Sequence, residues 1–233
     1  MNTQSQFWTV AQARPDERVA FIRRTYLHLA SAIALFVGLE VLLIRSPLAG
    51  AMVKFIFSNQ YGWLMILGAF ILAGWLARSL AANVTSVAAQ YAGLVLYTVA
   101  EAIIFVPLLY LAVFYSSPDV LPSAALLTGL LFAGLTAVVF TTGTDFSFLR
   151  SVLTIGGFLA LGMIIGSILF GFTLGLFFSL GMIVLASIAI LYDTSKILHH
   201  YSTDQHVAAA LELFASVALL FWYILRLLMM RRR

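Results

Sequence analysis

The stretch that decides the fold is GLFFSLGMIVLASIAILYDTSKILHH, residues 175–200. From Gly175 to Tyr192 it carries no charged side chain, and a helix of roughly 20 apolar residues is what crossing the hydrocarbon of a bilayer requires. Asp193 follows, and after Thr-Ser-Lys the apolar residues Ile197 and Leu198 continue the segment. The pattern predicts a membrane-spanning helix and raises the question of what an acid does there.

The composition of the whole chain also indicates a membrane protein. Of its 233 residues, 63% are hydrophobic and only 9% are charged, whereas soluble domains carry about 25% charged residues. We therefore predict an all-α, polytopic membrane protein. The absence of cysteine excludes disulfides and thiolate chemistry. The net charge of +4 comes largely from basic residues near the chain ends, which suits anionic lipid headgroups and does not indicate nucleic acid.

Seven segments are long and apolar enough to span. We expect them at about 27–44, 61–80, 86–111, 122–141, 150–170, 175–194 and 207–229. The apolar piece LAGAMVKFIF, residues 48–57, is too interrupted. The sequence thus predicts one seven-helix membrane domain, residues 27–230, after a cytoplasmic N-terminal segment, residues 1–26, that is not a cleaved signal peptide.

The basic residues leave the orientation open. Four arginines before the first span favour a cytoplasmic N-terminus. Seven spans then place the basic C-terminal tail outside, against the positive-inside rule. Either that tail is tolerated, which we expect, or one segment is re-entrant. The small-residue pattern GMIIG, residues 162–166, favours packing within the chain, with weak oligomerisation as the minority interpretation.

Acids inside apolar runs are the candidate functional residues, because intramembrane acids usually face a cavity or a partner. Glu101 lies deep in the third span, with Tyr97 and Thr98 on its helical face and Pro107 beyond. This group predicts a cation or proton site, and a single packing hydrogen bond is the alternative. Glu40, near the end of the first span, fits an interfacial acid.

Two further acids admit two interpretations each. Asp193 either works inside the membrane or meets water at a helix end, where Lys196 would pair with it. Glu212 either favours the N-terminal dipole of the last helix or forms a site with Ser216, one turn further on the same face. Arg226 lies four turns beyond Glu212, on nearly the same side.

Signatures of enzymes are weak. No GxSG motif, P-loop or GxGxxG is present, and TGTD ending at Asp145 falls in a predicted loop. An aspartyl intramembrane protease would need a second aspartate in a span close to Asp193. We expect no enzymatic activity, no cofactor and no resident metal.

Three parts of the sequence together resemble the Bax inhibitor-1 family, whose bacterial members are called YccA-like. FIRRTYLHLASAIALF is similar to the family's opening segment, and YTVAEAIIFVPLLYL to its Thr-x-x-Glu-Gly segment, with Ala102 for the usual Gly. In the C-terminal third, TTGTDFSFLRSVLTIGGFL, ILYDTSKILHH and VAAALELFASVALLFWYILRLL resemble its threonine-rich loop, its Tyr-Asp-Thr segment and its last helix. The resemblance covers nearly the full chain.

This resemblance implies seven helices with the last at the centre of the bundle. It also implies a pH-sensitive calcium leak, controlled by one aspartate on the sixth helix and one on the seventh. For bacterial members it implies an inner-membrane location, a role in stress tolerance and association with the membrane protease FtsH.

Carried onto this sequence, the sixth-helix aspartate is Asp193, but the seventh-helix aspartate falls on Ser216. A switch made of two acids works because like charges at short range cannot both ionise easily, and Ser216 cannot supply the second charge. Glu212, one turn earlier, is the candidate substitute. Glu101 matches the family Glu, and Arg226 matches an Arg expected to neutralise part of the acidic cluster.

The sequence therefore predicts a proton-regulated calcium leak in which Asp193 works with a displaced acid. The alternative is a regulatory protein that conducts nothing and binds FtsH. The departure at Ser216 favours that alternative to some degree.

Overall fold

A computed structural model describes residues 9–59 and 61–231, and these residues form eight helices. In chain order they are α1 (Pro15–Ile44), α2 (Pro47–Ser58), α3 (Gly62–Ala81), α4 (Val87–Tyr115), α5 (Val120–Thr142), α6 (Leu149–Phe170), α7 (Leu176–His199) and α8 (His206–Arg231). All except α2 are long and apolar enough to cross a membrane. The prediction of an all-α, seven-span protein is confirmed, and residues 48–57 lie in the one short helix.

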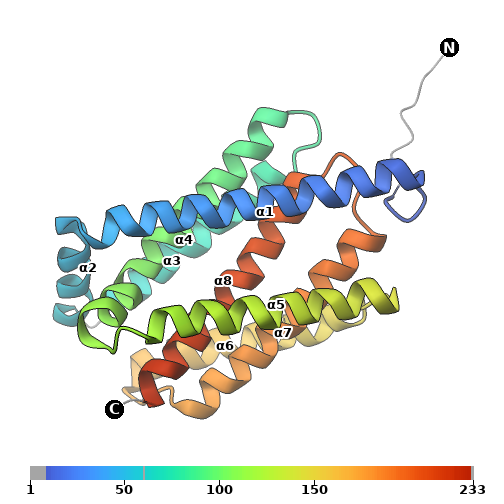
Figure 1. Cartoon of the computed structure of the whole chain (residues 1–233). Coiled ribbons are helices and arrows are strands. Elements are labelled where there is room, and N and C mark those ends of the chain that lie inside the picture. The colour runs from blue at the N-terminus through green and yellow to red at the C-terminus, as the bar shows by residue number, and fades with distance from the viewer. Residues whose placement is uncertain (1–8, 60, 232–233) are drawn as a thin grey trace.

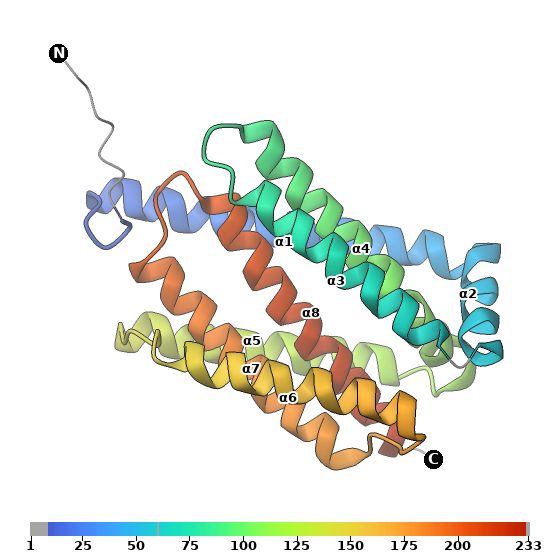
Figure 2. The ribbon, with the colours of Figure 1, turned by 180° about the vertical axis from the view of Figure 1, so that it is seen from behind.

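The last helix occupies the centre. Helix α8 packs against α1, α3, α4, α5 and α7. In both ribbon views it passes between a layer formed by α1, α3 and α4 and a layer formed by α5, α6 and α7 (Figures 1 and 2). A helix in this position can place side chains against both layers, so polar groups on α8 meet partners from either side.

Local sequence explains where the helices begin and end. Pro15 occupies the first turn of α1, where its missing N–H is tolerated, and the acids Asp16 and Glu17 suit the helix dipole. The helix therefore begins at Pro15 rather than at the predicted Leu27, and part of the segment 1–26 is helical. Helices α5 and α6 each end at a glycine with positive φ, Gly143 (60°) and Gly171 (74°).

Contacts at the N-terminal end hold three parts of the chain together. The Val10 N–H donates to the Tyr201 carbonyl at 2.9 Å, next to an isolated bridge between Thr9 and Ser202. The loop between α7 and α8 is thereby tied to the chain just before α1. Since this loop leads into α8, the chain segments that precede α1 and α8 lie side by side. The rings of His28, near the middle of α1, and His206, at the start of α8, lie 4.9 Å apart.

Candidate functional site

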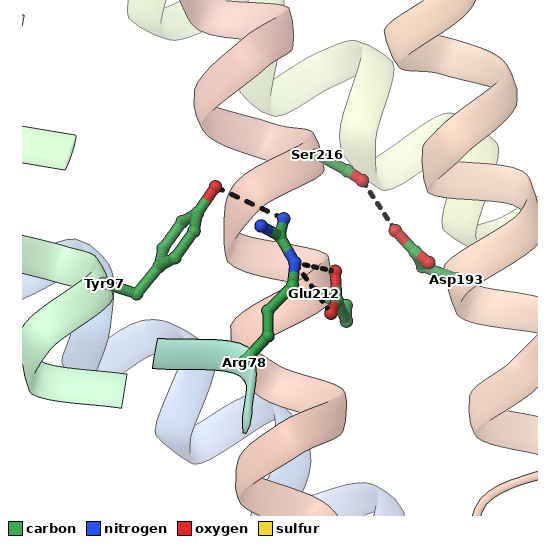
Figure 3. A network of polar contacts seen from close by, with 5 residues as sticks. All are labelled: Arg78, Tyr97, Asp193, Glu212 and Ser216. Carbon is green, nitrogen blue, oxygen red and sulfur yellow. Dashed lines mark hydrogen bonds and ion pairs between the residues drawn. The ribbon is translucent and has the colours of Figure 1, made fainter. Parts of the chain in front are cut away.

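Two polar side chains of α8, one helical turn apart, contact residues of the two opposite layers. Glu212 is paired with Arg78 of α3, and Ser216 is hydrogen-bonded to Asp193 of α7 (Figure 3). The structure thus brings together three of the predicted site residues, Asp193, Glu212 and Ser216. It adds Arg78, which the sequence analysis did not select.

The first contact is an ion pair between α3 and α8. The Arg78 Nε donates to both Glu212 carboxylate oxygens, at 3.0 and 3.1 Å. Its Nη2 donates to the hydroxyl of buried Tyr97 at 3.4 Å, and the guanidinium carbon lies 4.9 Å from that ring's centroid. A bidentate carboxylate contact and a ring both restrict the arginine. The positive charge is therefore fixed between α3, α4 and α8.

The second contact is buried. The Ser216 hydroxyl donates to Asp193 Oδ2 at 2.6 Å, and both residues are buried. Lys196 does not pair with Asp193, because its ammonium lies over the rings of Tyr192 and Tyr201 at 5.3 and 4.9 Å. The interpretation of Asp193 as a solvated partner of Lys196 is wrong, since α7 continues to His199 and the carboxyl faces α8.

Among the described residues, no hydrogen bond joins Glu212 to Asp193. Glu212 lies on α8 and contacts α3, whereas Asp193 lies on α7 and contacts α8 one turn further along. The expected pair of acids is therefore not formed in this structure. Glu212 makes a charged contact with Arg78, and Asp193 makes a hydrogen bond with the Ser216 hydroxyl.

Glu101 lies on α4 and is buried without a hydrogen bond in the described part of the chain. The two neighbours predicted for Glu101 do not contact its carboxyl. Thr98 donates a hydrogen bond to the Leu94 carbonyl at 2.8 Å, and the Tyr97 hydroxyl accepts one from Arg78. Glu101 instead lines a cavity of about 660 Å³ between α3, α4, α6, α7 and α8. A carboxyl in that position can contact an ion or a molecule that enters the cavity.

Arg226 lines the same cavity, close to the turn between α6 and α7. Its Nη2 donates to the Leu174 carbonyl at 2.6 Å. It lies 14 residues beyond Glu212 on α8, which is about 21 Å along a helix at 1.5 Å per residue. In this structure the charge next to Glu212 is that of Arg78, and Arg226 stands at the other end of α8.

Arg78 had a recognisable signal. It is a lone arginine in the run GWLARSL of the second span, and intramembrane charges are rare unless paired. It lies near the end of that span, where a long basic side chain can reach the interface without a partner, so the residue was not selected. Periodicity within one helix could not show that α3 and α8 bring Arg78 and Glu212 together.

A second polar cluster lies outside the spans, before α6. Asp145 contacts His200 Nε2 at 3.0 Å and accepts from Ser195 Oγ at 3.3 Å, while the Ser147 N–H donates to it at 2.9 Å. Partial burial acts to raise the pKa of Asp145, but the Ser147 N–H and His200 outweigh it, so the pKa is lowered. This cluster joins the loop before α6 to the end of α7.

The chemistry available at these contacts is the gain or loss of a proton on a carboxyl group, which changes the charge inside the helical bundle. The described residues contain no group of three or more His, Cys, Asp or Glu side chains that could hold a metal ion. The three acids have different surroundings. Asp193 accepts a hydrogen bond from Ser216, Glu212 is paired with Arg78, and Glu101 lines the cavity without a hydrogen bond among the described residues. Protonation of any one of them would remove a negative charge from that part of the helical bundle.

Comparison with known proteins agrees with the fold and the motifs. A stretch of 110 residues is 37% identical to the Uncharacterized protein PA2604 of Pseudomonas aeruginosa, covering 47% of this chain and 49% of that protein. The chain therefore matches about half the length of this curated relative. The family model described as Inhibitor of apoptosis-promoting Bax1 matches residues 18–233, nearly the whole chain. The chain is thus a multi-pass membrane protein that belongs to the Bax inhibitor-1 family.

Proposed function

We propose that this protein is a pH-regulated calcium leak of a bacterial inner membrane, closed in this structure by the Arg78–Glu212 pair. The observation that carries the proposal is the fixed guanidinium between α3, α4 and α8. A positive charge held in a narrow path is an electrostatic barrier to cations. A stress-tolerance role is part of the same proposal.

The proposed opening step is protonation of Glu212. The neutral acid no longer balances the charge of Arg78. The Arg78 side chain is 42% exposed and lies close to the end of α3, so once the ion pair is lost only the long contact to Tyr97 holds the guanidinium among the described residues. Arg78 then moves towards water with the end of α3 that carries it, and the barrier is removed. Acid conditions therefore favour flux.

The remaining polar residues have separate roles in this proposal. Asp193, held by Ser216, supplies a carboxyl beside the opened path from α7. Glu101 supplies one from α4 where the cavity ends. These acids attract calcium, which prefers oxygen ligands, but they hold it weakly enough for release because they do not converge on one ion.

The test is calcium flux into proteoliposomes between pH 4 and pH 8, a range that includes the ordinary titration of a glutamate, at about pH 4.3. We expect Glu212→Gln to conduct at pH 8 as fast as the unmodified protein does at pH 4. That rate is about tenfold higher than the rate of the unmodified protein at pH 8, as a coupling of this kind allows. Arg78→Gln is expected to raise flux at pH 8 to the level seen at pH 4, because the barrier is then absent at both pH values. Asp193→Asn is expected to lower flux in the open state, because the path loses a carboxyl.

The matched control is Glu17→Gln. Glu17 is also paired with an arginine, Arg14 at 2.8 Å, but the pair is exposed at the start of α1. This variant makes the same charge change and is expected to leave flux and its pH dependence unaltered. An unchanged pH response in Glu212→Gln would remove Glu212 from the gate.

The second candidate function is regulation of FtsH without conduction. It is favoured by the Ser216–Asp193 contact, which joins α7 to α8 through one acid and a neutral hydroxyl and needs no second titrating group. Folded protein that gives no flux above empty liposomes, but binds purified FtsH in nanodiscs, would establish this function in place of the leak. Loss of that binding in Asp193→Asn would place the contact in the interaction.

A further inference from the structure

The cavity that contains Glu101 and Arg226 forms a groove along α6, which we call the lateral groove. Its walls come from α3, α4, α6, α7 and α8, and include Trp63, Phe105, Leu161 and Trp222. Gly157 and Thr173 of its lining are exposed, so the groove opens to the outside of the helical body along α6. Figure 2 shows α8 in view between α3 and α6, and both of these helices contribute residues to the lining.

The lining of the lateral groove is apolar along its length and differs in charge at its two ends. Arg226 lies near the turn between α6 and α7, five residues before the described end of α8. Glu101 lies near the middle of α4, so it is deep in the bilayer. A volume of about 660 Å³ falls in the range of about 300–1,000 Å³ found for small-molecule sites.

Arg226 has donors to spare. Its guanidinium has five N–H groups, and one contact, to the Leu174 carbonyl, is made within the described residues. No carboxylate pairs with it there. Arginine recognises phosphate through two parallel N–H bonds, and a long side chain near the end of a span reaches the headgroup region.

We propose that the lateral groove binds one acyl chain of an anionic phospholipid, with the headgroup phosphate on Arg226. The acyl chain lies along the apolar walls formed by α6 and α8. The charge at each end fixes the orientation, because Arg226 attracts the phosphate and Glu101 disfavours an anionic headgroup at the deep end. The site does not depend on whether the protein conducts ions.

Tryptophan fluorescence provides a direct test. The chain has four tryptophans; Trp63 and Trp222 line the groove with ring centroids 5.8 Å apart, and Trp75 is 71% exposed. Replacing Trp75 and Trp8, which lies outside the described residues, by Phe leaves two reporters in the groove. Bromine atoms on an acyl chain quench only nearby indoles.

The protein is reconstituted in phosphatidylcholine vesicles containing a small fraction of either dibrominated phosphatidylglycerol or dibrominated phosphatidylcholine. We expect the anionic lipid to reach half-maximal quenching at about fivefold lower fraction, as one basic contact near a headgroup allows. Arg226→Gln should abolish this preference and Arg226→Lys should retain most of it. Arg45→Gln, an exposed arginine at the same end of the molecule, should leave it unchanged.

A second pair of variants tests the chain rather than the headgroup. A Cβ at Gly157 or at Gly162 meets no atom within 4 Å, so both positions accept a larger side chain. Gly157→Leu fills the groove and should reduce quenching by both lipids, whereas Gly162→Leu, on the same helix outside the lining, should not. Equal quenching by the two lipids, or a preference that survives Arg226→Gln, would overturn the headgroup assignment. Quenching unchanged by Gly157→Leu would overturn the acyl-chain site.

Discussion

Helices α4 and α6 are similarly apolar, yet they have different surroundings. In the most apolar window of α4, 56% of the residues are buried inside the protein, against 6% in α6. Lipid tails are as apolar as leucine, so hydropathy does not separate a helix in the bundle from one facing lipid. The two helices differ in how many of their side chains are packed against other helices. Substitutions at matched positions can measure how much that packing contributes to the free energy of unfolding.

The largest expected effect is that of Phe105→Ala. Phe105 is 2% exposed and lies 4.8 Å, between centroids, from the ring of Trp222 on α8. Removing a buried phenyl ring leaves a cavity, and we expect a loss of about 4 kcal/mol in the free energy of unfolding. Phe158→Ala in α6, where the ring is 74% exposed, should lose less than about 0.5 kcal/mol. Reversible unfolding in mixed micelles measures both, and equal losses would contradict the comparison.

Gly93→Ala should have the next largest effect. A Cβ at Gly93 would lie 2.5 Å from the Ala77 carbonyl oxygen and 2.6 Å from the Ala81 nitrogen, which are backbone atoms of α3. The two helices must separate, so we expect a loss of about 2–3 kcal/mol. The matched control in α6 is Gly162→Ala, where nothing lies within 4 Å of the added Cβ. A variant Gly93→Ala as stable as Gly162→Ala would show that α3 and α4 pack less closely than described.

Serine substitutions extend the comparison to polar groups. Ser216→Ala leaves the buried Asp193 carboxyl without its donor, and we expect a loss of about 1–2 kcal/mol. Ser167→Ala in α6 removes a hydroxyl that donates only to the Ile164 carbonyl of its own helix, at 2.8 Å. That loss should be close to zero by the same unfolding measurement. If both variants lose the same stability, the contact between α7 and α8 contributes nothing of its own.

The smallest effect concerns the loop that leads into α6. Because the pKa of Asp145 is lowered, its stabilising contribution is present above the unfolded value of about 3.9. It is lost as the pH falls through the lower, folded value. The group is 43% exposed, so screening limits the contribution to less than about 1 kcal/mol.

We expect Asp145→Asn to lower the unfolding temperature slightly at pH 7 and to match the unmodified protein at the acid end of the range. Thermal unfolding between pH 7 and pH 3 checks this. The control is Asp16→Asn, at an exposed position in the first turn of α1. A difference between Asp145→Asn and the unmodified protein that grows towards acid pH would reverse the expected sign.

The helices themselves were predictable from the sequence, but their ends were less so. All seven predicted spans overlap observed helices, because apolar length is a property of each segment alone. Helix α1 extends back to Pro15 and α7 extends on to His199. Hydropathy indicates which residues suit lipid, and a helix continues beyond them wherever its backbone and its caps allow.

The candidate site was predictable only in part. Asp193, Glu212 and Ser216 stood out as polar residues in apolar runs, and the spacing of Glu212 and Ser216 placed them on one face of α8. Their partners lie on α3 and α7, separated from α8 by 134 and 23 residues at the contacts. No periodicity within a helix contains that information.

The sequence by itself determined that this is a membrane protein, which seven segments are long and apolar enough to cross the bilayer, and which family it resembles. Hydropathy and motifs are local properties of the chain. Only the tertiary structure decided that Glu212 pairs with Arg78 while Asp193 is held by Ser216. It also decided that Arg226 faces a groove rather than the acids. The physical reason is that α8 packs between two layers, and the layer that each side chain meets depends on the rotation of one helix against all the others.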